Sequence, residues 1–376
     1  MILINKIKNT TRLEVNKLQT YKQQVSLPLP YPMEELCPLE ELLFFDIETT
    51  GFQADVSSLY LIGCIIYEND SFQMYQWFAD DYRSEADLLH AFFEIVATRH
   101  TLIHFNGDGF DIPYIKKKCE QHHLTYSFDA CRSIDLYKKI TPYKKILKLP
   151  NYKQKTIEQF LKINRTDPYT GGQLISVYVE YMKARFGYRD TSAYLAPLLL
   201  HNKEDLKGMI ELLKILHYID IFEVNLNLVQ ASLKNNYVEF ELATKIPLPS
   251  ELVYHENYLY LEARDTKVII RIAYYYGELK FFYKNYKEYY YLKEEDMAVH
   301  KSVAEYVDKE FREKAKASNC YVRKTALFLP CAHYMSVPCY RYNYYDKQQF
   351  IEITKEWLGN KNLLLLYLKE LLKTIG

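Results

Sequence analysis

The chain has 376 residues, and its 48 Lys and Arg residues balance its 48 Asp and Glu residues. A net charge of zero excludes a protein that is basic over its whole surface, so any contact with nucleic acid must come from a local patch. Hydrophobic residues form 49% of the sequence and charged residues 26%, which is typical of a folded globular protein. At this length we expect two domains.

Residues 1–40 include prolines at positions 28, 30, 32 and 38, and they predict a peripheral N-terminal arm. The first segment is too polar for a signal peptide, and no window reaches 18 uninterrupted apolar residues, so we expect no membrane span. The seven cysteines are scattered and odd in number, which favours a reducing compartment over a disulfide framework. We therefore predict a cytoplasmic protein.

Strands and helices alternate over residues 41–225, the first predicted domain. Three strand-like runs come first, and apolar stripes at helical spacing follow, with one short strand between them. The strands are expected at 42–46, 59–67, 71–78 and 101–105, and the helices at 84–99, 110–122, 172–186 and 192–220. This order predicts an α/β domain with a mixed sheet flanked by helices, as in a ribonuclease H-like fold.

The sequence changes in character beyond about residue 235. Alternating apolar and polar residues predict a meander of strands at 258–263, 268–276 and 278–283. We expect a helix over 295–318, another from residue 346 onward, and a leucine-rich helical end at 362–373 that packs into a core. Residues 236–376 are therefore predicted to form a second, accessory α+β domain.

The run LLFFDIETTGF, residues 42–52, ends a predicted buried strand with two acids. Asp46 and Glu48 are two residues apart, and alternate residues of a strand point to the same face. Two close carboxylates repel each other and are costly to bury, and a divalent cation with oxygen ligands offsets that cost. A bare D-x-E also occurs often by chance at an exposed strand end.

Two further acidic motifs follow. HFNGDGFDIPYI, residues 104–115, places Asp111 at the start of a predicted helix, and LLLHNKEDLKGM, residues 198–209, places Asp205 on another. With D-I-E-T-T-G, these motifs resemble the DEDD superfamily of 3′–5′ exonucleases, and within it the bacterial ribonuclease H-like proteins of the YprB type. The resemblance covers about residues 42–221.

The resemblance implies that Asp46, Glu48, Asp111 and Asp205 form a four-acid catalytic site that holds two divalent ions. Asp46 would be shared by both ions, Glu48 and Asp205 would complete the position that activates water, and Asp111 would steady the second ion. Mg²⁺ and Mn²⁺ both suit such oxygen ligands. The implied reaction is hydrolysis of phosphodiester bonds by a two-metal mechanism.

The family has two forms at the general base. One form has His five residues before the last Asp, and the other has Tyr four residues before it; here position 200 is Leu and position 201 is His. His201 thus stands at the spacing of the tyrosine form, and it shares a helix face with Asp205. His201 is the candidate that orients or deprotonates the attacking water, and the alternative is a partly buried histidine that packs on its helix.

Other residues are candidates for contact with the substrate. Asn106 would hydrogen-bond to it, or would only turn the chain between strand and helix. Phe52 would stack on a terminal base, or would only pack beneath its turn. Residues 136–156 carry seven lysines and three tyrosines but no acid, which suits a path for a single strand or else an ordinary solvated surface. In that stretch we expect Lys144, Lys145 and Lys148 to bind substrate.

The predicted function is therefore a metal-dependent nuclease acting on single-stranded or frayed DNA or RNA, in the form of a 3′–5′ exonuclease. An endonuclease of the ribonuclease H type uses a similar carboxylate cluster and is one alternative. A non-catalytic nucleic-acid-binding module, which the complete acid set disfavours, and an interaction protein are two others.

Overall fold

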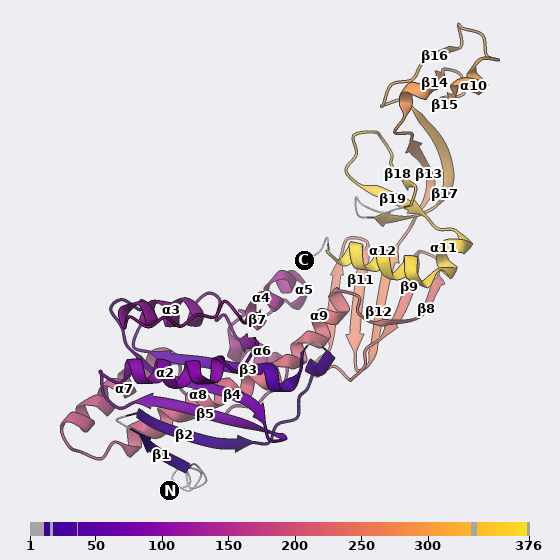
Figure 1. The fold of residues 1–376 in the computed structure, drawn as a ribbon. Coiled ribbons are helices and arrows are strands. Elements are labelled where there is room, and N and C mark those ends of the chain that lie inside the picture. Colours follow the sequence, from indigo (N-terminus) through magenta and orange to yellow (C-terminus); the bar gives the residue numbers. More distant parts are fainter. Residues whose placement is uncertain (1–10, 16–17, 36, 332–336, 374–376) are drawn as a thin grey trace. The chain divides into compact units, whose positions relative to one another are not determined.

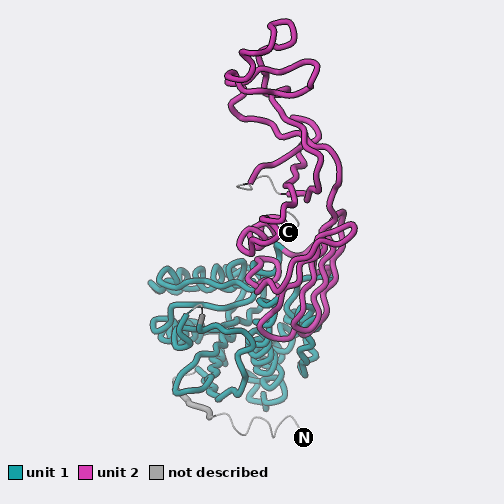
Figure 2. The backbone as a smooth tube through the Cα atoms, turned by 90° about the vertical axis from the view of Figure 1, so that its right-hand side faces the viewer, with its two compact units in different colours: residues 1–142, 149–217 teal, residues 143–148, 218–376 magenta. Residues whose placement is uncertain are grey.

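The computed structural model describes residues 11–15, 18–35, 37–331 and 337–373. The chain divides into two compact units (Figure 2). Unit 1 comprises residues 1–142 and 149–217, and unit 2 comprises residues 143–148 and 218–376. Part of the lysine-rich stretch therefore belongs to unit 2. The predicted boundaries at residues 41, 225 and 236 stay predictions.

Unit 1 is built on a mixed sheet of seven strands in the order β1-β2-β5-β4-β3-β6-β7. The central strand β3 runs antiparallel to β4 and parallel to β6, and β6 runs parallel to β7. The strands are β1 (Thr11–Val15), β2 (Leu18–Val25), β3 (Leu42–Thr49), β4 (Leu59–Glu68), β5 (Ser71–Ala79), β6 (Thr101–His104) and β7 (Arg132–Asp135).

Helices cover both faces of this sheet (Figure 1). Alternate residues of β3 divide between the two faces: Phe45 and Ile47 pack with α2 and α3, whereas α8 lies against β3 and β4 on the other side, where α7 also packs. The helices are α2 (Glu85–Val96), α3 (Asp111–Gln121), α4 (Leu136–Ile140), α6 (Gln154–Phe160), α7 (Gly171–Phe186) and α8 (Ser192–Leu212). The predicted mixed sheet flanked by helices is confirmed.

The N-terminal segment corrects the expectation of a peripheral arm. Strands β1 and β2 form a hairpin, and β2 pairs along its length with β5, so this segment extends the central sheet at one edge. The prolines at positions 28, 30, 32 and 38 lie after β2, between the sheet edge and β3. The prolines therefore mark only the second half of the segment as irregular.

A register shift interrupts the pairing of β3 with β4 beside the two acids. Glu48 lies opposite Leu61 and Thr49 lies opposite Leu59, so Tyr60 has no partner on β3. Bulges of this kind increase the local twist and often lie beside active sites. Tyr60 stacks on Tyr178 of α7 with ring centroids 4.1 Å apart, which anchors the bulged strand to the helical layer.

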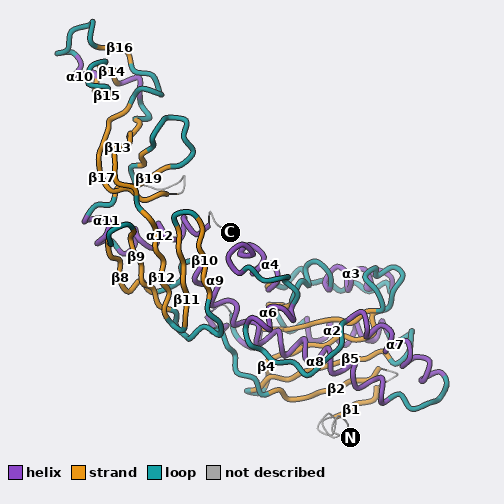
Figure 3. The backbone as a smooth tube through the Cα atoms, turned by 180° about the vertical axis from the view of Figure 1, so that it is seen from behind, coloured by secondary structure: helices purple, strands orange, loops and turns teal. Residues whose placement is uncertain are grey.

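Strands predominate in unit 2 (Figure 3). A five-stranded sheet in the order β10-β11-β12-β9-β8 buries alternate residues, and α12 contributes Tyr367, whose ring lies 6.2 Å from that of Phe240. A four-stranded sheet and a three-stranded sheet complete the unit. The predicted second domain of helices and sheets is confirmed, as is the helix at the leucine-rich end.

The strands of unit 2 are β8 (Asn227–Leu233), β9 (Tyr237–Ala243), β10 (Leu252–Glu256), β11 (Leu259–Arg264), β12 (Lys267–Ala273), β13 (Tyr275–Phe282), β14 (Tyr289–Leu292), β15 (Met297–His300), β16 (Arg312–Lys314), β17 (Tyr321–Cys331), β18 (Cys339–Tyr340) and β19 (Gln349–Glu352). Its helices are α5 (Lys144–Leu147), α10 (Lys301–Ala304), α11 (Lys355–Gly359) and α12 (Lys361–Lys373), while α9 (Leu216–Phe222) begins in unit 1.

The helix expected over residues 295–318 is wrong. That segment contains β15, the single helical turn α10 and β16. The two strands pair with β14 on either side and form the three-stranded sheet. Its buried apolar residues are the small side chains Ala298, Ala304 and Ala315, and the first and last of these pack with Cys320 and neighbouring tyrosines. The charged residues of the segment suit a helix, but it lacks the large apolar stripe that would bury one. Likewise, residues 349–352 form β19, and the helices begin only at residue 355.

Within the described part of the chain, no helix combines the length and the apolar character that crossing a membrane requires.

Candidate active site

Four carboxylates converge from three elements of unit 1. Asp46 and Glu48 come from the end of β3, Asp111 is the first residue of α3, and Asp205 lies on α8. Asp46 interacts electrostatically with each of the other three acids, and Glu48 interacts with Asp111 and Asp205. The structure therefore brings together the four acids that the sequence motifs predicted, while the roles assigned to them stay predictions.

Asp46 is held by a side chain from the helix packed on its face of the sheet. The Nδ2 atom of Asn202 donates to Asp46 Oδ2 at 2.9 Å, and Asn202 Oδ1 accepts from Gln76 Nε2 at 2.9 Å. Gly63 lies opposite Asp46 on one side and opposite Gln76 on the other. A Cβ atom at Gly63 would lie 2.0 Å from Asn202 Oδ1, so only glycine leaves room for Asn202 at this point.

Asp111 is tied directly to the strand that carries the first two acids. Its Oδ1 atom accepts the backbone N–H of Ile47, the residue between Asp46 and Glu48, at 3.2 Å. The Asp111 side chain thus reaches the strand from the N-terminus of α3, where the exposed N–H groups favour a negative charge. This bond fixes the second motif against the first.

Asp205 has a partly buried cationic partner that the sequence analysis did not identify. Arg165, in the loop between α6 and α7, donates from Nη2 to Asp205 Oδ1 at 2.6 Å. The other end of the guanidinium donates to Glu158 at 3.1 and 3.2 Å, and Glu158 is 1% exposed. One arginine therefore neutralises part of the acid cluster and a buried glutamate of α6 together.

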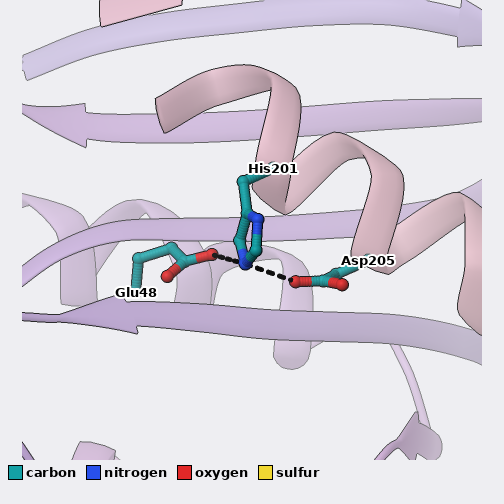
Figure 4. Close-up of side chains that lie close together, drawn as sticks. All are labelled: Glu48, His201 and Asp205. Carbon is teal, nitrogen blue, oxygen red and sulfur yellow. Dashed lines mark ion pairs between the residues drawn. The ribbon is translucent and has the colours of Figure 1, made fainter. Parts of the chain in front are cut away.

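His201 lies between the acid cluster and the same loop. Figure 4 shows its ring pointing at Glu48 and Asp205, and its Nε2 atom lies 3.2 Å from Asp205 Oδ2 and 3.9 Å from Glu48 Oε1. On the far side of the ring, Nδ1 lies 2.6 Å from Oδ2 of Asp167. The predicted shared face of His201 and Asp205 is therefore present. Asp167 is a partner that the sequence analysis missed.

The electrostatics of the cluster favour a bound cation. Burial, together with repulsion from Asp205, Glu48 and Asp111, raises the pKa of Asp46 well above its usual value. Burial and the charges of Asp205 and Asp111 likewise raise the pKa of Glu48. Burial raises the pKa of Asp111 to about 7. Acids that are this costly to ionise become stable as carboxylates when a divalent ion shares their charge.

The pKa of Asp167 is shifted in the opposite direction from those of the clustered acids. Burial works against its charge, but the backbone N–H of Tyr169, the His201 ring and the Lys155 ammonium group together hold the pKa of Asp167 below its usual value. The Tyr169 N–H donates to Oδ1 at 3.0 Å and Lys155 donates to Oδ2 at 3.1 Å. Asp167 is therefore a fixed, ionised acceptor behind His201.

The two residues proposed to contact substrate near the acids both lie at the surface. Phe52 is 89% exposed, with its ring edge-on to Phe110 at 6.1 Å. Asn106 is exposed and has a φ of 61°, the left-handed conformation that asparagine tolerates in turns. Its N–H donates to Asp135 Oδ1 at 2.9 Å. The turn role of Asn106 is therefore visible, and contact of either residue with substrate stays a prediction.

Asp135 also belongs to a second group of possible metal ligands, with His104 and Asp108. Hydrogen bonds inside the protein account for this group. Asp135 accepts the N–H groups of Asn106 and Tyr137, and Asp108 pairs with Lys138 at 2.7 Å. The group holds the turn that leads into α3 and so helps to place Asp111.

The three lysines predicted to bind substrate are all exposed, at and just after α5 in unit 2. Lys148 ends this helix in the left-handed conformation, with a φ of 49°, and its ammonium group lies 5.4 Å from the centre of the Tyr254 ring. The structure brings these lysines together on one short helix of the second unit. Their contact with nucleic acid stays a prediction.

Comparison with known families identifies the larger part of unit 1. The model of the RNase_H superfamily matches residues 43–217, a segment that contains the four acids and His201. These residues are similar to the RNase_H superfamily, and the predicted ribonuclease H-like fold is confirmed. The finer assignment to the YprB type stays a prediction.

A curated relative is the DNA polymerase of Autographa californica nuclear polyhedrosis virus, which is 26% identical over 186 aligned residues. The match spans 36% of this chain and 19% of the viral protein, so it covers only about a fifth of that relative.

Three solved structures are also similar at low sequence identity. The family B DNA polymerase of Pyrobaculum calidifontis gives a TM-score of 0.39 at 12% identity, covering 67% of this chain and 35% of the polymerase. A structure of exonuclease I gives 0.32 at 11%, covering 59% of this chain and 55% of the exonuclease. The zinc-bound complex of E. coli ExoI with single-stranded DNA gives 0.29 at 12%, covering 55% of each chain.

Proposed function

We propose that this chain, whose residues 43–217 match the RNase_H superfamily, is a metal-dependent nuclease that acts as a 3′–5′ exonuclease on single-stranded or frayed DNA or RNA. The observation that carries the proposal is the convergence of four acids from β3, α3 and α8, two of which, Glu48 and Asp205, also face the buried His201. A structural role for these acids is costly, because like charges that are buried together destabilise a fold.

The side chains of the cluster fit Mg²⁺ or Mn²⁺. All four acids offer carboxylate oxygens, the ligands that such hard cations prefer. Asp46, Glu48, Asp111 and Asp205 would hold two ions, which when bound would supply positive charge to polarise the phosphate and to acidify water. The raised pKa values of Asp46, Glu48 and Asp111 support this assignment, because the repulsion of the carboxylates needs a compensating charge.

His201 is the proposed proton acceptor. Its Nε2 atom faces Glu48 and Asp205 at 3.9 and 3.2 Å, so a water molecule that approaches those two carboxylates meets the imidazole nitrogen. The side chain is 6% exposed, so it is held in place by packing. A positioned base of this kind contributes about 10²–10⁴-fold to the rate.

Substrate contacts are proposed at the exposed Phe52 ring, at Asn106 and at the lysines of α5. An aromatic ring that is almost fully exposed offers a face on which an unpaired base can stack. Lys144, Lys145 and Lys148 supply positive charge for phosphates on a chain with no net charge. The YprB type and a cytoplasmic location belong to this proposal as predictions from the sequence.

The test uses the purified full-length chain with 5′-labelled single-stranded DNA and RNA, in Mg²⁺ and in Mn²⁺. A ladder that shortens progressively from the 3′ end supports the exonuclease, and the Asp46→Ala variant, prepared in parallel, shows whether a contaminating nuclease contributes. Internal cuts would replace the proposal by an endonuclease of the ribonuclease H type. A shifted band of the labelled strand on a native gel, without cleavage, would replace it by a nucleic-acid-binding module. If the strand is neither cleaved nor bound, an interaction protein becomes the better explanation.

A further inference from the structure

Asp167 and His201 form a buried pair behind the acid cluster. Asp167 Oδ2 lies 2.6 Å from His201 Nδ1, and the two side chains are 0% and 6% exposed. Asp167 comes from the loop between α6 and α7, 34 positions before His201 in the chain. It touches the histidine on the side of the ring that faces away from Glu48 and Asp205.

The contact determines which nitrogen of the ring carries a proton. An ionised carboxylate only accepts hydrogen bonds, so the hydrogen atom in the 2.6 Å contact must lie on Nδ1. In a neutral imidazole the other nitrogen, Nε2, then carries the lone pair. Nε2 is the atom that faces Glu48 and Asp205.

Asp167 is itself held firmly enough to fix the ring. The Tyr169 N–H anchors Oδ1 at 3.0 Å, and Lys155 donates to Oδ2 at 3.1 Å. The carboxylate therefore cannot rotate away from His201 without losing these bonds. Its partner Lys155 also donates to the carbonyl oxygen of Tyr169, so the loop closes on α6.

We propose that Asp167 is a positioning residue for catalysis, holding the His201 ring with the Nδ1 proton toward the loop between α6 and α7 and with Nε2 facing Glu48 and Asp205. This inference rests on the proposed nuclease function. Asp167 lies on the side of the ring away from Glu48 and Asp205, and its contact with His201, at 2.6 Å, is much shorter than its 3.9 Å approach to Arg165, the partner of Asp205. The competing explanation is that Asp167 only fastens the loop between α6 and α7.

The activity test is a double-mutant cycle on the full-length chain. Asp167→Asn should lower kcat by about 10–100-fold, the usual effect of losing a residue that orients an active-site histidine, with KM and substrate binding in Ca²⁺ unchanged. In the His201→Ala background, Asp167→Asn should have no further effect, because its route to the reaction is already gone. Losses that multiply instead would overturn the proposal and favour the loop explanation.

Asp80→Asn is the matched control. Asp80 is also a buried acid of unit 1, and it pairs with Arg185 at 3.0 Å and with Gln19, away from His201. The Asp80→Asn variant should leave kcat unchanged. It thereby separates a general effect of removing a buried carboxylate from the specific effect on His201. A wild-type kcat in Asp167→Asn would overturn the proposal.

A spectroscopic measurement tests the contact without any nuclease assay. In ¹⁵N-labelled protein, the neutral form of the His201 ring should carry its proton on Nδ1, and Asp167→Asn should change this signature. A proton on Nε2 in the parent protein would overturn the inference. If the signature is as expected but the parent cleaves no substrate, the proposed function fails while the hydrogen-bond assignment stands.

Discussion

Arg165 donates to Asp205 Oδ1 at 2.6 Å, so the last acid of the cluster is paired with a partly buried arginine from a loop 40 positions earlier in the chain. The Arg165 side chain is 10% exposed and also holds Glu158, which is 1% exposed. A single cation thus offsets two carboxylates that would otherwise be buried without a counter-charge.

Arg165→Gln should therefore lower the free energy of unfolding by about 3–5 kcal/mol, because it leaves buried carboxylates without their partner. Urea unfolding measures this loss. Added Mn²⁺ should restore part of it by taking over the neutralisation of Asp205. Lys183→Gln is the matched control, since the side chains of its ion pair with Glu180 are 62% and 48% exposed and an exposed pair contributes about 1 kcal/mol or less. Equal stabilities of the Arg165 variant and the parent would contradict the prediction.

Asp46→Ala and Asp205→Ala should both abolish hydrolysis but differ in stability. Without divalent cations, Asp46→Ala should unfold at the same or higher urea concentration, because it removes repulsion with Glu48, Asp111 and Asp205. Asp205→Ala should unfold earlier, because it takes a partner from Arg165. Cleavage of a labelled oligonucleotide measures activity, and retained cleavage in either folded variant would contradict the four-acid assignment.

The raised pKa of Asp111 predicts that the stability of the fold depends on pH. Its pKa is raised from 3.8 to about 7, so in this interval the folded state binds a proton that the unfolded state has released. This contribution to stability is complete below about pH 4 and is lost as the pH rises through about 7, by up to about 1.4 kcal/mol per pH unit for one proton.

The measurement compares urea unfolding of the parent and of Asp111→Asn in EDTA across that interval. The parent should lose stability relative to the variant as the pH rises. Mn²⁺ should reverse the trend, because the carboxylates bind it in their ionised form. A difference between the two proteins that stays constant with pH would exclude a raised pKa at this position.

Gly63→Ala should disturb the site through Asn202. A Cβ atom there would lie 2.0 Å from Asn202 Oδ1 and 2.7 Å from Leu206 Cδ1, so α8 must shift away from the sheet. We expect a loss of about 1–3 kcal/mol in stability, as for other overpacked cores, and lower nuclease activity because Asp46 loses its partner. Gly171→Ala is the control, since no atom lies within 4 Å of the added carbon. Unchanged activity in Gly63→Ala would show that Asn202 is dispensable.

Replacing Lys144, Lys145 and Lys148 with Gln should weaken the binding of all single strands alike. The dependence of log K on log salt should flatten by up to about 0.7 for each phosphate contact that is lost. Binding is measured in Ca²⁺ at several salt concentrations. The control replaces Lys301, Lys309 and Lys316, which are also exposed residues of unit 2. If both triple variants keep the parental salt slope, the α5 lysines form an ordinary solvated surface.

Much of unit 1 could be predicted because its signals are local. The strands and helices over residues 41–225 follow apolar periods of two and 3.6 residues, which depend only on neighbours in the chain. Each acidic motif combines such an element with its own turn, as at Asp46 and Asp111. The helix expected over residues 295–318 was wrong because charged residues favour a helix only weakly, and the small sheet is stabilised by contacts of its tyrosines.

The sequence by itself therefore determined the main strands and helices of unit 1 from β3 onward, the three motifs and the five residues proposed for the chemistry. Only the tertiary structure decided which side chains support them. Asp167, Arg165 and Asn202 contact residues 34, 40 and 156 positions away, and no local period encodes such pairings. The glycines at 63 and 208 are local signs of such contacts, since a glycine inside a strand or helix often marks a place where another side chain approaches the backbone closely. Here Asn202 approaches Gly63 and Glu158 approaches Gly208. These polar contacts contribute strongly to the stability of the site only because packing excludes water from them. That packing exists only when the whole unit has folded.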